Sequence, residues 1–189
     1  AFDVVLSQIA TAVYEGRPAP PAGWTAVSDA DLAAAGIPDP QAWREQFLSG
    51  GEELVSQHFK AEIYRDCSGN FVLAYRGTDG SGADWMNNFR QGTGFTTSDG
   101  LDKFSDLATR TATEFAHRFG TRGADGQYAN LAITGHSQGG GLASVAALAS
   151  GVPAVTFDAS GIHPNTLERM GIAPDAARDA AEGGLVRAY

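Results

Sequence analysis

Residues 135–139 read Gly-His-Ser-Gln-Gly (GHSQG), a G-x-S-x-G stretch from which the rest of the chain is interpreted. It follows an apolar run at 129–134 (ANLAIT) that predicts a buried strand. It precedes residues 140–150 (GGLASVAALAS), whose apolar positions 142, 145, 146 and 149 recur on one face of a helix. The order strand, sharp turn, helix is the setting in which this motif presents an exposed serine at the edge of an α/β sheet.

The glycines of this stretch have a mechanical reason. Side chains two positions either side of Ser137 would collide with the incoming strand and the outgoing helix, and glycine avoids the collision. A serine hydroxyl is a poor nucleophile, so it needs a base beside it and amide donors for the oxyanion that it creates. The alternative is a chance match in a loop of a chain with 24 glycines. The flanking strand and helix favour the functional interpretation.

Length and composition limit the possibilities. The 189 residues are enough for one domain, which we place at 1–189, and no apolar run reaches the ~18 residues of a transmembrane helix. The net charge of −9 argues against nucleic acid as a partner and against adsorption to anionic lipid by a basic patch. A single cysteine, Cys67, excludes an internal disulfide, and no Cys/His cluster offers a metal site. We therefore expect neither metal nor cofactor.

The first 55 residues predict a helical region. An amphipathic helix opens the chain, a proline-rich connector follows at 17–23, and Ser28 begins a capping box whose helix ends at Gly36. Asp39 and Pro40 then cap a third helix. This region is either an accessory layer over the core or a binding cap, and we favour the layer.

From residue 60 the pattern changes to strands alternating with helices. Residues 61–65 and 71–75 predict an antiparallel hairpin, with Cys67 at its turn. A long amphipathic helix carries Phe104, Phe115 and Phe119, and strands follow at 152–157 and 185–189. We expect an α/β fold with a mainly parallel sheet flanked by helices.

Two backbone amides are candidates for the oxyanion hole. One is the N–H of Gln138, the residue after the candidate nucleophile. The other is the N–H of Thr78, which follows the strand at 71–75, with Gly77 allowing the backbone to turn its N–H groups inward. Residues 76–80 (RGTDG) can also be an ordinary turn, for which these residue types are common.

Three segments together resemble the fungal-type class 3 lipases: 74–89 (AYRGTDGSGADWMNNF), 133–147 (ITGHSQGGGLASVAA) and 155–164 (VTFDASGIHP). The N-terminal part, with APPAGW at 19–24, is similar to the lipase domains of bacterial antibacterial effectors. The resemblance implies an α/β-hydrolase fold, Ser137 as nucleophile, Thr78 and Gln138 as oxyanion residues, and a lipid or phospholipid ester as substrate. Asp84 would then anchor a loop.

The chain departs from this pattern in its triad. The fold places the acid and then the histidine after the serine, yet His163 is the only histidine that follows Ser137 in this sequence. We therefore expect the acid and the base beyond Tyr189, so that the domain is incomplete at its C-terminus. The alternative is a compact triad of Asp158 and His163 with Ser137. His136, beside the nucleophile, is expected to be a packed structural residue.

Residues 84–100 are candidates for an apolar lip or lid, with Phe95 the candidate for substrate contact.

The leading hypothesis is a serine lipase or phospholipase that touches the membrane surface transiently. As an antibacterial effector it would be a toxin with a cognate immunity protein, exported without a visible signal peptide. The alternative from another class is an inactive or non-catalytic binding module. A thioesterase or peptidase also fits, because fold does not fix substrate.

Overall fold

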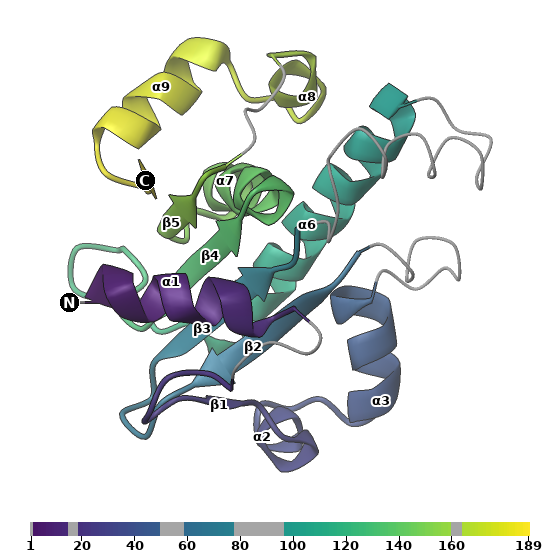
Figure 1. The fold of residues 1–189 in the computed structure, drawn as a ribbon, viewed down its shortest axis with the longest axis vertical. Coiled ribbons are helices and arrows are strands. Elements are labelled where there is room, and N and C mark those ends of the chain that lie inside the picture. The colour runs from purple at the N-terminus through teal and green to yellow at the C-terminus, as the bar shows by residue number, and fades with distance from the viewer. Residues whose placement is uncertain (1, 15–18, 50–58, 78–96, 160–163) are drawn as a thin grey trace.

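A computed structural model describes residues 2–14, 19–49, 59–77, 97–159 and 164–189. Its centre is a six-stranded sheet in the order β1-β2-β3-β4-β5-β6 (Figure 1). The strands are β1 (Thr25–Ala26), β2 (Ala61–Arg65), β3 (Phe71–Tyr75), β4 (Leu131–His136), β5 (Ala154–Phe157) and β6 (Val186–Ala188). The pairs from β1 to β3 are antiparallel and those from β3 to β6 are parallel, so the sheet is mixed.

The hairpin of β2 and β3 forms as its sequence predicts. Ile63 pairs with Leu73 at its middle. At the turn, Asp66 Oδ1 accepts hydrogen bonds from the backbone N–H groups of Ser68 and Asn70, both at 2.9 Å. This arrangement leaves Cys67 exposed at the turn.

Helices cover both faces of the sheet, and the alternation along the strands separates two cores. Leu73 and Ile133 face the larger cluster, which holds α6 (Thr97–Phe119) and α7 (Gln138–Ser150). Val72 and Ala132 point the other way, into a smaller cluster with α1 (Phe2–Ala12). Figure 1 shows α1 crossing one face while α6 and α7 lie behind the strands.

The two helices on the larger face differ in how they are buried. The stripe predicted for α6 is buried throughout, at Phe104, Ala108, Thr111, Phe115 and Phe119. In α7, by contrast, the buried residues cover a broad face of the helix, and they include Gly139, Gly140, Leu142, Ala143, Val145, Ala146 and Ala147. The expectation that Ala149 shares the buried face is wrong, because Ala149 is exposed. The small residues let this broad face pack closely against the sheet and α6.

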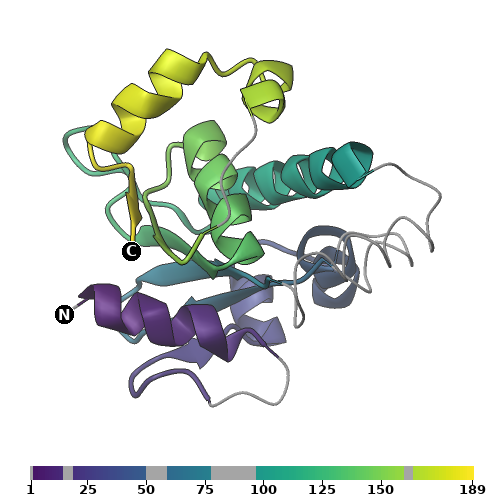
Figure 2. The same ribbon diagram turned by 45° about the horizontal axis from the view of Figure 1, so that its top comes forward.

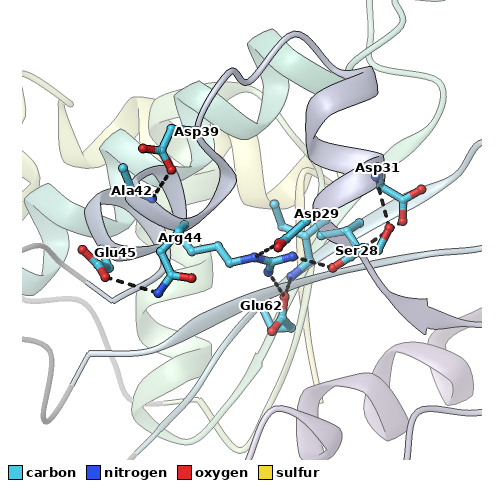
Figure 3. Close-up of polar contacts among 11 residues, drawn as sticks. Ser28, Asp29, Asp31, Asp39, Ala42, Arg44, Glu45 and Glu62 are labelled. Carbon is cyan, nitrogen blue, oxygen red and sulfur yellow. Dashed lines mark hydrogen bonds and ion pairs between the residues drawn. The ribbon is translucent and has the colours of Figure 1, made fainter.

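The N-terminal region begins its helices as predicted. Around α2 (Asp29–Ala34), the Ser28 hydroxyl accepts a bond from the Asp31 N–H, and the Asp31 carboxylate accepts one from the Ser28 N–H (Figure 3). Asp39 caps α3 (Pro40–Trp43) by accepting from the Ala42 N–H, and a π-helix, η1 (Arg44–Leu48), continues it.

Arg44 fastens these helices to the sheet. Its guanidinium bonds the Asp29 carboxylate at 3.1 Å and the Val27 carbonyl at 2.7 Å, and lies 3.6 Å from the Glu62 carboxylate of β2 (Figure 3). Burial raises the pKa of Glu62 despite this cation.

The prediction that the first 55 residues are all helical is wrong at Thr25–Ala26, where the backbone pairs with β2 as edge strand β1. The favoured accessory layer fits α1, α2 and α3, whose apolar residues join the two clusters.

Between β5 and β6 the chain makes an excursion that sequence patterning did not predict. It contains α8 (Pro164–Arg169) and α9 (Pro174–Glu182), and both views place these helices beyond α7 (Figures 1 and 2). Arg169 bonds Asp106 of α6 at 2.8 Å. The predicted strand at the end of the chain does return to the sheet, parallel to β5. In the residues described above, no helix has the length and apolar character needed to cross a membrane.

Candidate active site

Ser137 lies at the sharp turn between β4 and α7, where the sequence placed it. Its φ of 55° and ψ of −123° are unfavourable for a residue with a side chain. It occupies the N-cap position of α7, but its hydroxyl makes no capping hydrogen bond in the described structure. The side chain is half-buried. The turn therefore strains the backbone and does not use the hydroxyl to satisfy the helix end.

The glycines on either side of Ser137 are required by close backbone contacts. A Cβ atom on Gly135 would lie 2.2 Å from the Gly139 carbonyl oxygen. A Cβ on Gly139 would lie 2.2 Å from the Tyr75 carbonyl oxygen. Both separations are far below van der Waals contact, so the sequence argument for glycine at these two positions is confirmed.

The end of β3 packs directly against this turn. A Cβ on Gly139 would be 2.8 Å from the Gly77 nitrogen, so the backbone at Gly77 touches the first turn of α7. The Tyr75 side chain points away into the larger core, where its hydroxyl donates to the Ala108 carbonyl at 2.5 Å. Burial raises the pKa of Tyr75 well above its ordinary value, so this phenol stays neutral and is no acid–base candidate.

Of the two predicted oxyanion donors, the structure describes one. Gln138 is the first residue of α7, and the N–H groups of a helix's first turn lack intrahelical acceptors. They also carry the positive end of the helix dipole, which favours a negative charge beside Ser137. Thr78 lies outside the described residues, although its neighbour Gly77 is placed against the turn.

The carboxyl ends of β4, β5 and β6 meet beside Ser137. The Ser137 N–H donates to the Phe157 carbonyl at 3.0 Å, and the Asp158 N–H donates to the Tyr189 carbonyl at 2.8 Å. The rings of Phe157 and Tyr189 stack with centroids 5.8 Å apart. The final strand therefore ends at the same edge as the candidate nucleophile.

Asp158 and His136 face each other at this edge. Asp158 has a φ of 46° and an exposed carboxylate, whose Oδ2 lies 3.7 Å from His136 Nε2. His136 also lies edge-on to the Tyr14 ring, with centroids 6.4 Å apart, but its side chain is 40% exposed, so the predicted packing covers only part of the ring. The compact triad stays a prediction, because His163 lies outside the described residues.

Several other predicted residues also lie outside the described part of the chain: Phe95, Asp84, Trp85 and His58. His117 is exposed in the last turn of α6. The acidic residues at 168, 175, 179 and 182 are exposed too, in agreement with a solvated stretch. Across the ranges that the structure describes, no three His, Cys, Asp or Glu residues gather into a possible metal site.

Sequence patterning missed one residue of this site, Tyr14. It falls one position beyond the apolar stripe of the first helix, so no periodicity singled it out. Its side chain is buried, and its oxygen accepts a hydrogen bond from the Gly77 N–H at 3.0 Å. The same hydroxyl lies 3.5 Å from the His136 carbonyl oxygen, to which it donates.

A hollow of about 690 Å³ lies elsewhere, lined by residues that include Asp106, Leu148 and Met170. Because an α-helix rises about 1.5 Å per residue, Leu148 stands roughly 16 Å along α7 from Ser137. This hollow is at the far end of that helix from the candidate nucleophile.

Comparison with known proteins gives two findings. The family model described as "Phospholipase-like: Tle-like phospholipase domain" matches residues 5–189. The chain is also 37% identical over 187 residues to an extracellular phospholipase A1 of Serratia liquefaciens. That alignment covers 99% of this chain and 51% of the relative, so the chain spans about half the length of the curated relative that it matches.

Proposed function

The chain belongs to the Tle-like phospholipase domain family, and on that premise we propose that it is a serine hydrolase of phospholipid esters. The observation that carries the proposal is the backbone of Ser137, strained at a φ of 55° between β4 and α7 with its hydroxyl unused as a cap. Strain of this kind concentrates at functional sites, where the surrounding packing maintains it. The relative's name, an extracellular phospholipase A1, supports a carboxyl ester of a phospholipid as the substrate class.

In the proposed reaction, the Ser137 oxygen attacks the ester carbonyl while its proton passes to a base. The tetrahedral oxyanion is bound by the N–H of Gln138, at the N-terminus of α7, and by the N–H of Thr78. The base returns the proton to the departing glycerol oxygen, which leaves an acyl group on Ser137. A water molecule then hydrolyses the acyl-enzyme and releases the fatty acid.

The base and the acid have two competing assignments. The order serine, acid, histidine of this fold favours residues that follow Tyr189 in the gene product. The compact alternative uses Asp158 and His163. Separate replacement of Asp158 and His163 by Ala tests it, since His163→Ala would then lower turnover about as much as loss of the nucleophile does, and Asp158→Ala would cause a smaller but still large loss.

The substrate's acyl chains need an apolar contact, and Phe95 is our candidate for it. Burial of methylene groups contributes about 0.8 kcal/mol each, so such a contact can hold one chain during transient adsorption at a membrane surface.

The N-terminal resemblance to antibacterial effectors supports a role as an exported toxin with a cognate immunity protein. Growth of a susceptible bacterium that makes the protein in its periplasm, with and without a candidate immunity protein, tests that role.

The central experiment replaces Ser137 by Ala in the full-length gene product. We expect hydrolysis of a short p-nitrophenyl ester and release of fatty acid from phospholipid vesicles to fall by about 10³-fold or more. The matched control is Ser144→Ala, on the same helix, where the hydroxyl bonds the Gly140 carbonyl at 3.0 Å. Equal turnover in Ser137→Ala and the unaltered protein would remove the serine mechanism and favour the binding-module alternative. Phospholipids labelled in one acyl chain at a time report which ester is cleaved.

A further inference from the structure

A buried phenol joins the two segments that meet at the candidate nucleophile. Tyr14 lies two residues beyond the end of α1 and is only 9% exposed. Its ring belongs to the smaller core with Leu6, Ile9 and Val13 of the same segment. Its hydroxyl reaches the edge of the sheet, where it accepts from the Gly77 N–H at 3.0 Å and donates to the His136 carbonyl at 3.5 Å.

The geometry around Gly77 shows how tightly these groups meet. A Cβ atom on Gly77 would lie 2.6 Å from the Tyr14 oxygen and 2.7 Å from the His136 carbonyl oxygen. The N–H of Gly77 is in a buried residue, so loss of its acceptor would leave a donor without a partner away from water. The position of Gly77 is therefore fixed jointly by the turn at Ser137 and by the Tyr14 hydroxyl.

The Tyr14 hydroxyl contacts Gly77 and His136, and each of these adjoins a part of the candidate active site. His136 immediately precedes Ser137, and Gly77 opens the loop to which the proposed function assigns an oxyanion donor. We propose that Tyr14 is a positioning residue for the reaction, which sets the distance between the nucleophile turn and the start of that loop. This inference rests on the proposed function.

A positioning role predicts a specific kinetic signature. An oxyanion interaction exists in the transition state and not in the bound substrate, so a misplaced loop lowers kcat and leaves KM nearly unchanged. Loss of a complete oxyanion donor costs about 10²- to 10³-fold in kcat, and a displaced loop retains part of that interaction. We therefore expect Tyr14→Phe to lower kcat by about 10-fold or more, with KM within about twofold.

The matched control is Tyr64→Phe in the same full-length gene product. Tyr64 is a buried phenol of the same core, on β2 and not at the turn. We expect this control to keep kcat within about twofold of the unaltered protein, because no group at the turn depends on it. Active-site titration with a fluorophosphonate normalises each rate to the number of folded sites, so a partial loss of folding does not imitate a loss of kcat.

A second readout separates positioning from packing. A boronic acid that forms a tetrahedral adduct on Ser137 should bind Tyr14→Phe more weakly, in proportion to the fall in kcat/KM. A non-hydrolysable ether phospholipid, which mimics only the bound substrate, should bind both proteins equally. A structural role for Tyr14 would weaken both ligands or neither.

The outcomes are distinguishable from those for the proposed function. Unchanged kcat in Tyr14→Phe, with Ser137→Ala inactive, would overturn the positioning role and leave the serine mechanism intact. Equal losses of kcat in Tyr14→Phe and Tyr64→Phe would also overturn it, in favour of general packing. Full activity of Ser137→Ala would overturn the proposed function and, with it, this inference.

Discussion

Two helices of this protein begin at a serine, and their hydroxyls are used in opposite ways. At the start of α2, Ser28 has a relaxed backbone with φ −86° and ψ 168°, and its hydroxyl accepts a hydrogen bond from the Asp31 N–H at 3.1 Å. At the start of α7, Ser137 has a φ of 55° and makes no capping bond within the described structure. The same residue type at the same helix position therefore caps the helix in one place and leaves its hydroxyl out of the cap in the other.

The difference comes from what surrounds each backbone. Ser28 is exposed in a connector and can adopt the extended conformation that N-caps prefer. Ser137 is confined between Gly135 and Gly139, which touch each other's backbone, and its N–H is bound to the Phe157 carbonyl. A strained conformation of this kind costs about 1–3 kcal/mol and persists because the surrounding contacts impose it.

The largest expected effect on stability comes from a steric clash introduced at the Ser137 turn. Gly139→Ala places a Cβ 2.2 Å from the Tyr75 carbonyl oxygen, and the backbone there cannot yield as a flexible side chain would. We expect the free energy of unfolding to fall by about 3 kcal/mol, with loss of ester turnover, as measured by urea unfolding and a p-nitrophenyl assay.

The control for this change is Gly69→Ala at the hairpin turn. Gly69 has a φ of +83°, but no atom lies within 4 Å of its Cβ position, so only backbone strain of about 1 kcal/mol is expected. If both variants lose the same stability, close packing at the Ser137 turn is not what holds its conformation.

An intermediate effect comes from the same substitution at both serines. Ser137→Gly should raise the free energy of unfolding by about 1 kcal/mol, because glycine adopts a φ of 55° without strain. Ser28→Gly should lower it by a few tenths of a kcal/mol, because a cap is lost. Chemical denaturation of both variants measures the two signs. A loss of stability in Ser137→Gly would contradict the view that this backbone stores strain.

The smallest effect is a dependence on acid at the capping box of α2. Hydrogen bonds from the Ser28 N–H and hydroxyl hold the pKa of Asp31 below its ordinary value of 3.8. Because the folded-state pKa is the lower one, this carboxylate stabilises the fold above about pH 3.8, and the stabilisation disappears as the pH falls through the folded-state pKa.

Replacement of Asp31 by Ala measures that contribution. We expect the Tm to fall by about 2 °C at neutral pH, and the difference from the unaltered protein to shrink as the pH falls below the ordinary pKa of 3.8. Thermal unfolding followed by circular dichroism at several pH values provides the comparison. A Tm difference that is the same at every pH would show that the charge on Asp31 does not contribute.

Local sequence patterns predicted the elements that depend on local chemistry. The Ser28 capping box, the Asp39-Pro40 helix start, the hairpin at 61–75 and the stripe of α6 all formed as expected. In each, neighbours three or four positions apart, or directly across a tight turn, settle the conformation. The turn at Ser137 is a mixed case, because a Cβ on Gly135 would meet Gly139 within the turn, whereas a Cβ on Gly139 would meet the Tyr75 carbonyl of β3.

Long-range pairing was not predictable in this way. Thr25–Ala26 carries no strand pattern of its own and becomes β1 because β2 presents an open edge. The helices α8 and α9 lie in a polar, mostly exposed stretch, and apart from its first proline α9 has only alanines as apolar residues. By spacing Ala149 shares the helical face of the buried Leu142 and Val145, yet it lies in the last turn of α7 and is exposed, and a period alone does not show where a covered face ends.

The sequence by itself predicted that Ser137 stands at a sharp turn between a strand and a helix, because glycine at 135 and 139 leaves room for a backbone approach that a Cβ would block. Only the tertiary structure decided that the turn is tied to a phenol 123 residues earlier, through Gly77 and the His136 carbonyl. The reason is that these hydrogen bonds form only once α1 has packed on the sheet and brought Tyr14 to its edge. The residues around Tyr14 in the sequence do not indicate where α1 packs.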